Sequence, residues 1–432
     1  MERAILVGID LEDGADFDRS MKELKALAEA CDMEVCGMVT QKLPYINKAY
    51  YIGTGKVDEV REYATALEAS VVVFDNPLSP AQLGNLKEAT GKAVLDRTNL
   101  ILQIFSTRAR TREAKLQVES ANLQYLLPRL VGAHDALSRQ GGASGAMSNK
   151  GAGEKKLELD RRHIEKRLAQ LRRELKEVEA ERETQRKSRM KSNLSVAALV
   201  GYTNAGKSSL MNGMLSFAEE AEKKQVFEKD MLFATLDTTV RKIEVPRGKG
   251  FLLTDTVGFI DKLPHQLVKA FYSTLEEVRN ADLLIHVVDL SDPDYKEHMR
   301  VTIETLHDLE ADGIPRITVY NKTDLAGLVG NIQEMLTKPV TTNEERKVRL
   351  SAKNPSDIEA LITYISRCAY REEKEASLLL PYDKGSIYSY LKENATILSE
   401  EYRADGIFLK AILSEQDVGK YREFIIKRML DE

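Results

Sequence analysis

The stretch "GYTNAGKSS", from Gly201 to Ser209, matches the pattern G-x-x-x-x-G-K-[ST]. It follows the apolar run "VAALVGY" and precedes a helical pattern, and this context makes the match specific and argues against a chance glycine loop. Gly201 and Gly206 allow the backbone amides to face phosphate oxygens at the amino end of a helix. Lys207 is therefore expected to reach the β and γ phosphates of a nucleotide, and the Ser208 hydroxyl to bind Mg²⁺.

Two motifs that would sense the γ phosphate follow along the chain. The first, "FATLD" at 233–237, offers Thr235 as a hydroxyl that closes on Mg²⁺ and the γ phosphate, although Thr238 and Thr239 are near enough to take that role. The second, "DTVG" at 255–258, offers Asp255 for a metal-bound water and the Gly258 amide for the γ phosphate. Glycine is needed at 258 so that the backbone can approach the phosphate.

Two later motifs indicate the base. In "NKTD" at 321–324, the Asp324 carboxylate can accept from both the ring N–H and the exocyclic amine of guanine, which favours GTP over ATP. The backbone of "SAK" at 351–353 can lie against the guanine O6. Five motifs in this order, each at the end of a predicted strand, predict a GTP site.

The predicted site residues fall into three groups. The catalytic group is Lys207, Thr235 and Gly258, and the metal ligands are Ser208 and Thr235. The nucleotide-binding residues are Gly201, Tyr202, Thr203, Asn204, Ala205, Gly206, Lys207, Ser208, Ser209, Phe233, Ala234, Thr235, Leu236, Asp237, Asp255, Thr256, Val257, Gly258, Asn321, Lys322, Thr323, Asp324, Ser351, Ala352 and Lys353.

Phe259 stands where many GTPases place a glutamine that positions the attacking water. An apolar side chain can neither accept a proton nor orient water by hydrogen bonding. We therefore expect the isolated protein to hydrolyse GTP slowly, with the missing alignment supplied by a switch backbone group, another side chain or a bound partner. Our hypothesis is that Phe259 helps to couple turnover to docking.

The length of 432 residues predicts two to four domains, and 43% hydrophobic and 30% charged residues argue against wholesale disorder. No apolar run approaches the roughly 20 residues that cross a bilayer, and the first residues lack the features of a signal peptide, so we expect a cytoplasmic protein without a transmembrane segment. Cys31, Cys36 and Cys368 lack disulfide or zinc spacing and are expected to be buried, reduced thiols.

Alternation of apolar runs and amphipathic stretches predicts a multidomain α/β protein. In residues 1–108 we expect an N-terminal α/β domain, with strands at 4–9 and 71–74, helices at 17–30 and 57–69, and a tight glycine turn into a helix at "YIGTGK". The other predicted domains are a helical hairpin at 109–192, a doubly wound GTPase domain at 193–371 and a small α/β domain at 372–432.

The predicted hairpin pairs a helix at 113–127, ended by Pro128, with a heptad-patterned helix at 154–190. A loop rich in Gly and Ser is expected at 131–154. Residues 108–191 contain 21 Lys and Arg against 12 Asp and Glu, which indicates contact with nucleic acid; a solvated helix pair joined by a disordered linker is the alternative. The basic residues flanking the loop are Arg129, Arg139, Lys150, Lys155 and Lys156.

The histidines show no zinc spacing. His286 alternates into an apolar strand and is expected to be a core histidine with its hydrogen bonds satisfied. The others are His134, His163, His265, His298 and His307.

The chain resembles the HflX GTPases over nearly its full length. The stretches that carry the resemblance are "YYIGTGKVDEV", "DRTNLILQIFSTRARTREAKLQVESANLQYLLPRL", "GAGEKKLELDRRHIEKRL", "GYTNAGKSSLMN", "LFATLDTTVRKI" and "DTVGFIDKLPHQLVKAFYSTLEEV". The family usually has proline where Thr238 stands, and G-P-G-E-T-Q-L-E where this chain has "GAGEKKLE" at 151–158. The resemblance implies a cytosolic translational GTPase that binds the large ribosomal subunit, with the hairpin reaching toward the peptidyl-transferase centre and ribosomal RNA.

The motifs predict a Mg²⁺-dependent GTPase, and the resemblance implies that the ribosome stimulates it, that it binds the large subunit and that it dissociates stalled or stressed ribosomes. Its expected ligands are GTP and GDP, without DNA, and it is expected to be a monomer when free. Two alternatives stay open: a large-subunit assembly factor, and a GTP-gated RNA- or protein-binding regulator in which hydrolysis is incidental.

Overall fold

The computed structural model describes residues 1–11, 16–140, 147–190, 194–217, 239–245, 249–262, 272–337, 346–370, 374–413 and 415–426. The chain forms two compact units. The first contains Met1–Glu183 and also includes Val257–Leu275, and the second contains most of the chain from Thr184 onward. The predicted multidomain α/β fold is confirmed, whereas the exact domain boundaries stay a prediction.

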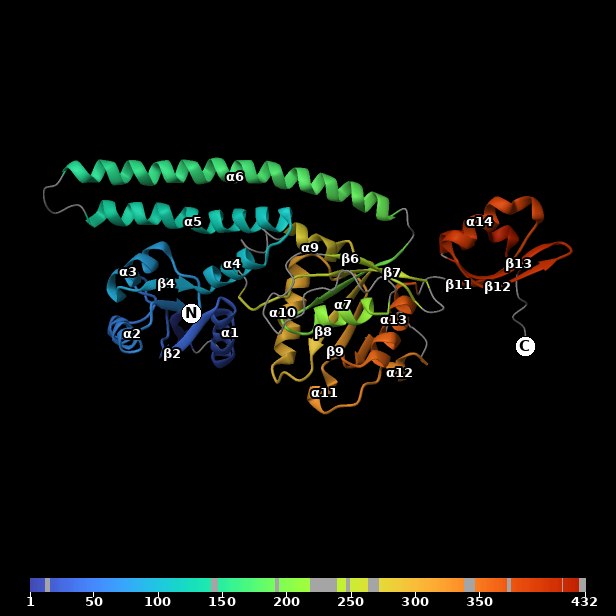
Figure 1. The fold of residues 1–432 in the computed structure, drawn as a ribbon, viewed down its shortest axis with the longest axis horizontal. Coiled ribbons are helices and arrows are strands. Elements are labelled where there is room, and N and C mark those ends of the chain that lie inside the picture. The colour runs from blue at the N-terminus through green and yellow to red at the C-terminus, as the bar shows by residue number, and fades with distance from the viewer. Residues whose placement is uncertain are drawn as a thin grey trace. The chain divides into compact units, whose positions relative to one another are not determined.

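The N-terminal domain is a parallel sheet with strand order β2-β1-β3-β4 (Figure 1). Its apolar side chains, among them Ile5, Val7, Val72 and Phe74, are fully buried, which explains the continuous apolar runs in the sequence. The elements are β1 (Glu2–Asp10), α1 (Phe17–Ala30), β2 (Met33–Lys42), α2 (Thr54–Ala66), β3 (Val71–Phe74), α3 (Pro80–Thr90), β4 (Ala93–Asp96) and α4 (Arg97–Arg108).

"YIGTGK" is a turn into a helix, as predicted. Gly53 is the N-cap of α2, and its N–H donates to the side chain of Gln41 at 2.9 Å. The helix begins at Thr54, three residues before the predicted start at Val57, and ends at Ala66.

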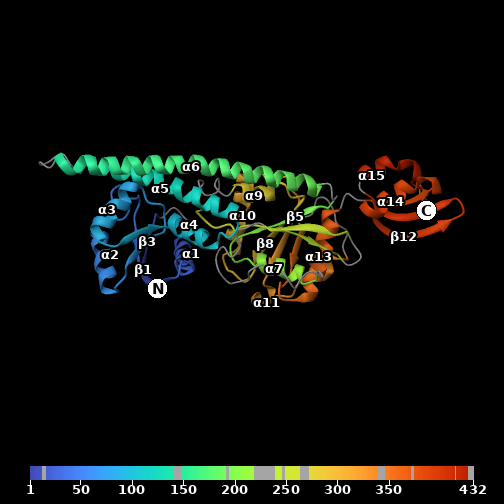
Figure 2. The ribbon, with the colours of Figure 1, turned by 45° about the horizontal axis from the view of Figure 1, so that its top comes forward.

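Two long antiparallel helices, α5 (Arg112–Gln140) and α6 (Met147–Met190), run side by side (Figures 1 and 2). Arg182 pairs with Glu113 at 2.7 Å, and Arg167 forms two hydrogen bonds with Glu119 at 2.7 and 2.8 Å. As the residue number rises along α5, from Glu113 to Glu119, the number of the partner on α6 falls, from Arg182 to Arg167. These pairs therefore fix the antiparallel register. The predicted heptad seam includes the buried Leu168 and Leu171.

Two predictions about this hairpin were wrong. Pro128 does not end the first helix, and most of the predicted loop at 131–154 is helical: only residues 141–146 separate the helices, and they lie outside the described residues. Proline removes one backbone donor, and nearby carbonyls can then take side-chain partners. The carbonyl left without a backbone donor is that of Gln124, four residues before Pro128. Arg129 Nη1 donates to the neighbouring Tyr125 carbonyl at 2.8 Å, and Tyr125 and Arg129, on either side of Pro128, both bind Asp96, so the helix is held together across the proline.

A buried carboxylate ties α5 to the N-terminal sheet. Asp96, which is fully buried, accepts from the amides of Leu78 and Asn99 at 3.0 and 2.9 Å. It also accepts from the Tyr125 hydroxyl at 2.7 Å and from Arg129 Nη2 at 2.9 Å. The Arg129 guanidinium lies 3.3 Å from the centroid of the Tyr125 ring. Arg129, predicted as a basic flank for RNA, is thus committed to an internal contact.

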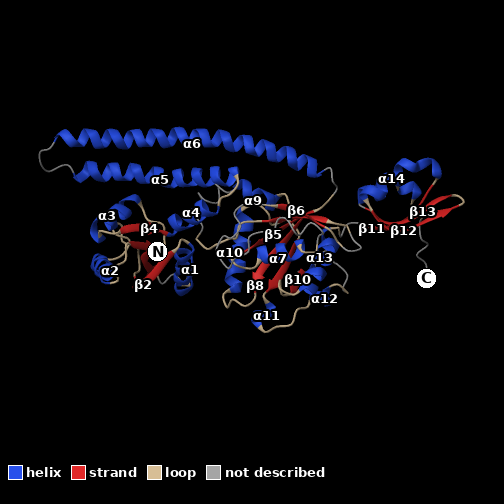
Figure 3. Ribbon diagram, in the orientation of Figure 1, coloured by secondary structure: helices blue, strands red, loops and turns tan. Residues whose placement is uncertain are grey.

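The second unit contains a six-stranded sheet of order β10-β9-β8-β5-β7-β6, in which only β6 is antiparallel to its neighbour (Figure 3). The predicted doubly wound sheet is therefore confirmed, with a reversed edge strand. Its strands are β5 (Val196–Gly201), β6 (Val240–Ile243), β7 (Phe251–Asp255), β8 (Leu283–Asp289), β9 (Arg316–Asn321) and β10 (Arg346–Arg349).

Described helices follow the strands along the chain, and three of them, at 207–215, 332–335 and 355–369, contribute apolar side chains to one core with the strands. Leu210 and Met211 from one helix and Leu361 and Ile365 from another are fully buried there. The helices are α7 (Lys207–Leu215), α9 (Tyr272–Arg279), α10 (Tyr295–Asp308), α11 (Thr323–Ala326), α12 (Ile332–Met335) and α13 (Pro355–Ala369).

The C-terminal part is a small mixed α/β unit, as predicted, with an antiparallel sheet of order β11-β13-β12. Leu378, Leu391 and Leu409 form its fully buried centre. Its elements are β11 (Lys374–Leu380), α14 (Gly385–Asn394), β12 (Thr396–Arg403), β13 (Gly406–Leu413) and α15 (Glu415–Lys420).

The three cysteines are free thiols, but only Cys368 is buried. The prediction of burial was wrong for Cys31 and Cys36, which are partly exposed near the N-terminal sheet. Within the described residues, no helix combines the length and the apolar character needed to cross a membrane.

The Asp96 contacts predict the cost of removing them. Asp96→Ala should lower the free energy of unfolding of the N-terminal domain by about 3–5 kcal/mol, because it leaves the Arg129 charge without its buried partner. Hydrogen exchange of the α4 amides, measured at increasing urea concentrations, gives this change in the free energy of unfolding. Asp58→Ala, which removes an exposed pair with Arg61, should cost less than about 1 kcal/mol. Equal effects of the two substitutions would contradict the role of Asp96 as the buried partner of Arg129.

Candidate nucleotide-binding site

The phosphate loop joins β5 to α7, and both of its glycines are required by close contacts. Gly201 has φ of 148°, and a Cβ there would lie 2.3 Å from the Val287 carbonyl oxygen. Gly206 has φ of 95°, and a Cβ there would lie 2.2 Å from Asn321 Nδ2. Any larger residue would have to displace these groups, so the loop can take this path only with glycine.

Lys207, the first residue of α7, points back over its own loop. Its Nζ donates to the carbonyls of Gly201 and Tyr202 at 3.0 and 2.7 Å. Burial lowers the pKa of Lys207 to about 8, and the nearby Asp255 charge opposes this shift. The ammonium group is thus held at the loop where a phosphate would meet it.

Ser208 and Asp255 bring two oxygen atoms together beside the phosphate loop. Ser208 Oγ donates to Asp255 Oδ2 at 3.3 Å, and Asp255 is fully buried at the end of β7. A hydroxyl and a carboxylate suit Mg²⁺, which prefers oxygen ligands and keeps several waters or phosphate oxygens around it. The residues present therefore fit the metal predicted from the sequence.

Asn321 links the phosphate loop to the predicted base-binding loop. It is 1% exposed at the end of β9; its Nδ2 donates to the Ala205 carbonyl at 3.0 Å, and its Oδ1 accepts from the Ala352 amide at 2.9 Å. One side-chain amide thus sets the separation of two loops that lie about 150 residues apart in sequence.

Asp324 and the "SAK" loop line an open cavity of about 400 Å³, a size suited to a small ligand. Ser351 Oγ donates to Asp324 Oδ1 at 2.7 Å, and Lys353 Nζ lies 3.9 Å from Asp324 Oδ2. Lys322, with φ of 61°, donates from Nζ to Asp289 Oδ2 at 2.7 Å. Sequence reasoning missed Asp289, although its place at the carboxyl end of β8 was a signal.

The structure gathers most of the predicted site along one edge of the sheet. Residues 201–206 form the loop, 207–209 begin α7, 255 ends β7, 321 ends β9, 323 and 324 begin α11, and 351–353 follow β10. Thr256 Oγ1 donates to the Leu199 carbonyl at 2.5 Å beside the loop. Val257, Gly258 and Phe259 belong to the first unit, and residues 233–238, including Thr235, lie outside the described residues.

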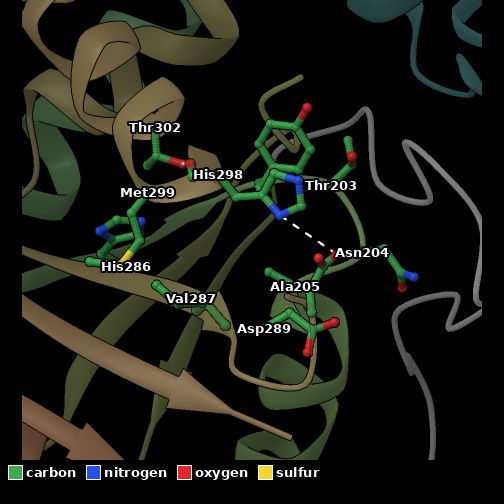
Figure 4. A pocket seen from close by; sticks show the side chains of 12 residues that line it. Thr203, Asn204, Ala205, His286, Val287, Asp289, His298, Met299 and Thr302 are labelled. Carbon is green, nitrogen blue, oxygen red and sulfur yellow. Dashed lines mark hydrogen bonds and ion pairs between the residues drawn. The ribbon is translucent and has the colours of Figure 1, made fainter. Parts of the chain in front are cut away.

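A small pocket of about 40 Å³ beside the loop contains two histidines (Figure 4). The His298 ring stacks on Tyr202, with ring centroids 4.0 Å apart. His286 is 1% exposed, and burial, followed by the Arg316 and Lys207 charges, lowers its pKa to about 3. His286 is a core residue as predicted, but its Nδ1 has no hydrogen-bond partner in the described part of the chain, so it is not fully satisfied.

Comparison with known proteins places the chain in a family. It is 44% identical to GTPase HflX of Caldanaerobacter subterraneus over 98% of this chain and 94% of that protein. The chain belongs to the GTPase HflX family. GTPase HflX of Escherichia coli is 38% identical over 94% of this chain and 92% of its own length. As a member of this family, the chain binds GTP and is a GTP hydrolase.

Family descriptions match three successive regions of this HflX-family chain. Residues 18–106 match "GTP-binding GTPase N-terminal", residues 108–189 match "GTP-binding GTPase Middle Region", and residues 196–322 match "50S ribosome-binding GTPase". A solved GTP-binding protein from Sulfolobus solfataricus in complex with GDP is similar at 25% identity and a TM-score of 0.44, over 86% of this chain and 99% of that one.

The contact between Gly206 and Asn321 predicts the effect of adding a methyl group. Gly206→Ala should weaken GDP binding by about tenfold to a hundredfold, because the strained φ and the displaced amide together cost about 1–3 kcal/mol. Titration with a fluorescent GDP analogue measures the affinity. Gly313→Ala, at a position with open space around it, should leave the affinity unchanged. Wild-type affinity in Gly206→Ala would disprove the assigned loop.

Proposed function

We propose that this chain is a GTP-hydrolysing factor that associates with the large ribosomal subunit and dissociates stalled or stressed ribosomes. The observation that carries the proposal is the joining of a phosphate loop and a guanine-type loop through Asn321 in a chain that aligns almost end to end with GTPase HflX proteins. The description "50S ribosome-binding GTPase" for residues 196–322 supports the large subunit as the partner.

In this proposal each part of the site has one task. The amides of the phosphate loop and Lys207 bind the β and γ phosphates, and the Asp324 carboxylate accepts from the guanine N–H groups. Ser208 and Thr235 would hold Mg²⁺, with Asp255 accepting from a metal-bound water. When bound, Mg²⁺ would neutralise charge that develops on the phosphate oxygens.

Water alignment is the part of the chemistry that the site residues leave incomplete. Phe259 is 2% exposed, and its ring has no group that could orient water. We infer that hydrolysis is slow in the free protein and faster on the ribosome, where docking would complete the site. Phe259 would then help to couple turnover to docking, as the sequence first indicated.

The exposed face of α6 supports contact with ribosomal RNA. Arg162, Lys166, Arg173 and Lys176 are exposed and follow spacings of four, seven and three residues, so they lie on one side of the helix. From Arg162 to Lys176 this row is about 21 Å long, a length that can follow several phosphates of an RNA strand. Arg129, Arg167 and Arg182 bind carboxylates on other elements and are not part of this row, whereas Arg162 has a partner on α6 itself, Glu158 at 3.0 Å.

Single-turnover hydrolysis tests the ribosome-linked activity. With GTP bound, adding large subunits should raise the hydrolysis rate by about tenfold or more, because docking supplies the missing alignment. Lys207→Ala, which removes the phosphate-binding ammonium, should show no stimulated activity. If large subunits leave the wild-type rate unchanged, the ribosome-factor proposal fails and a GTP-gated regulator with incidental hydrolysis is favoured.

Sedimentation separates ribosome splitting from subunit assembly. Whole ribosomes mixed with the protein and a non-hydrolysable GTP analogue should lose their whole-ribosome peak and gain subunit peaks, since the GTP-bound form is the one expected to dock. The same mixture with GDP is the control. An undiminished whole-ribosome peak, with the protein on free large subunits, would instead favour an assembly factor.

A further inference from the structure

Lys262 lies four residues after Gly258, and side chains of the N-terminal domain bind it. Within the first unit, Lys262 Nζ lies 2.6 Å from Asp75 Oδ2 and 2.7 Å from Ser20 Oγ. The Lys262 side chain is one-third exposed, whereas that of Asp75 is 2% exposed. A lysine from the segment that follows the "DTVG" motif therefore has its charge neutralised at a carboxylate of the N-terminal sheet.

The carboxylate occupies a typical ligand position in a parallel sheet. Asp75 directly follows β3, and the strand order β2-β1-β3-β4 reverses direction between β1 and β3. Parallel sheets bind ligands at the carboxyl ends of the strands at such a reversal. The Ser20 hydroxyl, from α1, donates to Asp75 at 2.7 Å. In this protein, the position is filled by Lys262 from the chain itself.

Asp75 keeps its negative charge because two cations face it. Burial would raise the pKa of Asp75, but the Arg97 and Lys262 charges, with hydrogen bonds from Lys262 and Ser20, hold that pKa below its usual value. Arg97 Nη1 lies 2.8 Å from Asp75 Oδ1, and the same guanidinium pairs with Glu23. Removal of Lys262 would thus leave Asp75 with the Arg97 partner, so the site can survive without the lysine.

The backbone at Lys262 is held in a conformation that lysine rarely adopts. Its φ is 55°, in the left-handed region, and its N–H donates to Asp261 Oδ1 at 2.9 Å. Asp261 Oδ2 in turn accepts from Arg19 Nη2 at 3.2 Å. Two ion pairs with the N-terminal domain therefore hold a turn that a lysine would otherwise tend to leave.

The link between Gly258 and Lys262 is short and partly packed. Four extended residues span at most about 14 Å, and Phe259 and Ile260 in this link are each 2% exposed. Buried side chains move in discrete steps because packed interiors resist continuous deformation. A displacement of Gly258 toward a phosphate is therefore expected to reach Lys262.

We propose that Lys262 is a nucleotide-sensitive latch: it binds Asp75 in one arrangement of the segment after Gly258 and leaves Asp75 when the Gly258 amide binds the γ phosphate of GTP. This inference rests on the proposed function and on the role predicted from the sequence for the Gly258 amide at the γ phosphate. By linkage, if binding of a nucleotide weakens the Lys262–Asp75 contact by some factor, removing that contact must tighten the binding of the nucleotide by the same factor.

The test compares two nucleotides on the full-length protein without ribosomes. Lys262→Met should tighten the binding of a non-hydrolysable GTP analogue by at least about fivefold relative to GDP, because the latch no longer opposes the rearrangement. Lys56→Met is the matched control, since Lys56 forms a 2.7 Å pair with Glu59 in the same domain, away from this segment in sequence. Ser20→Ala removes one hydroxyl contact of Lys262. It should shift the ratio of analogue affinity to GDP affinity in the same direction as Lys262→Met, but by a smaller factor.

A second measurement follows the segment directly. In the wild type, the GTP analogue should change the hydrogen exchange of the amides at 257–262, and this response should be reduced in Lys262→Met; a melting curve confirms that the variant is folded. An unchanged or lowered ratio of analogue to GDP affinity in folded Lys262→Met overturns the latch while leaving the proposed GTP site intact. If the wild type binds neither nucleotide, the proposed function itself fails.

Discussion

The side-chain amide of Asn321 is the interaction on which the nucleotide site depends. It donates to the phosphate loop at Ala205 and accepts from the "SAK" loop at Ala352, so it ties both loops to the carboxyl end of β9. The same amide occupies the space that a Cβ at Gly206 would need. The glycine in the phosphate loop is therefore required by the same amide that holds the "SAK" loop.

A second set of buried charges organises the N-terminal unit. Asp96 and Asp75 stand at the ends of adjacent strands, and each carboxylate binds a segment that comes from elsewhere in the chain: α5 through Tyr125 and Arg129, and the residues after Gly258 through Lys262. Removing a partner from a buried carboxylate is costly, so these contacts define which segments the domain binds. The anchoring of α5 and the proposed Lys262 latch thus use carboxylates at the same edge of one small sheet.

Sequence patterns predicted much of the fold because they report local periodicity. The range of α1 and the strand at Val71–Phe74 agree with the prediction to the residue. Pro128 was misread because proline removes only one hydrogen bond of a helix, and contacts on either side of it, here those of Tyr125 and Arg129 with Asp96, can hold the helix together. His286 was misread because alternation predicts burial of a side chain and says nothing about whether its ring nitrogens find partners.

The sequence by itself determined the GTP motifs, their order and the family, since these depend on residue type and spacing along the chain. Only the tertiary structure decided which charged side chains pair within the protein: Arg129 with Asp96, Lys322 with Asp289 and Lys262 with Asp75. These partners lie 33, 33 and 187 residues apart, and no local pattern can pair them. Ion pairing depends on distance and burial in space, which only the folded chain defines.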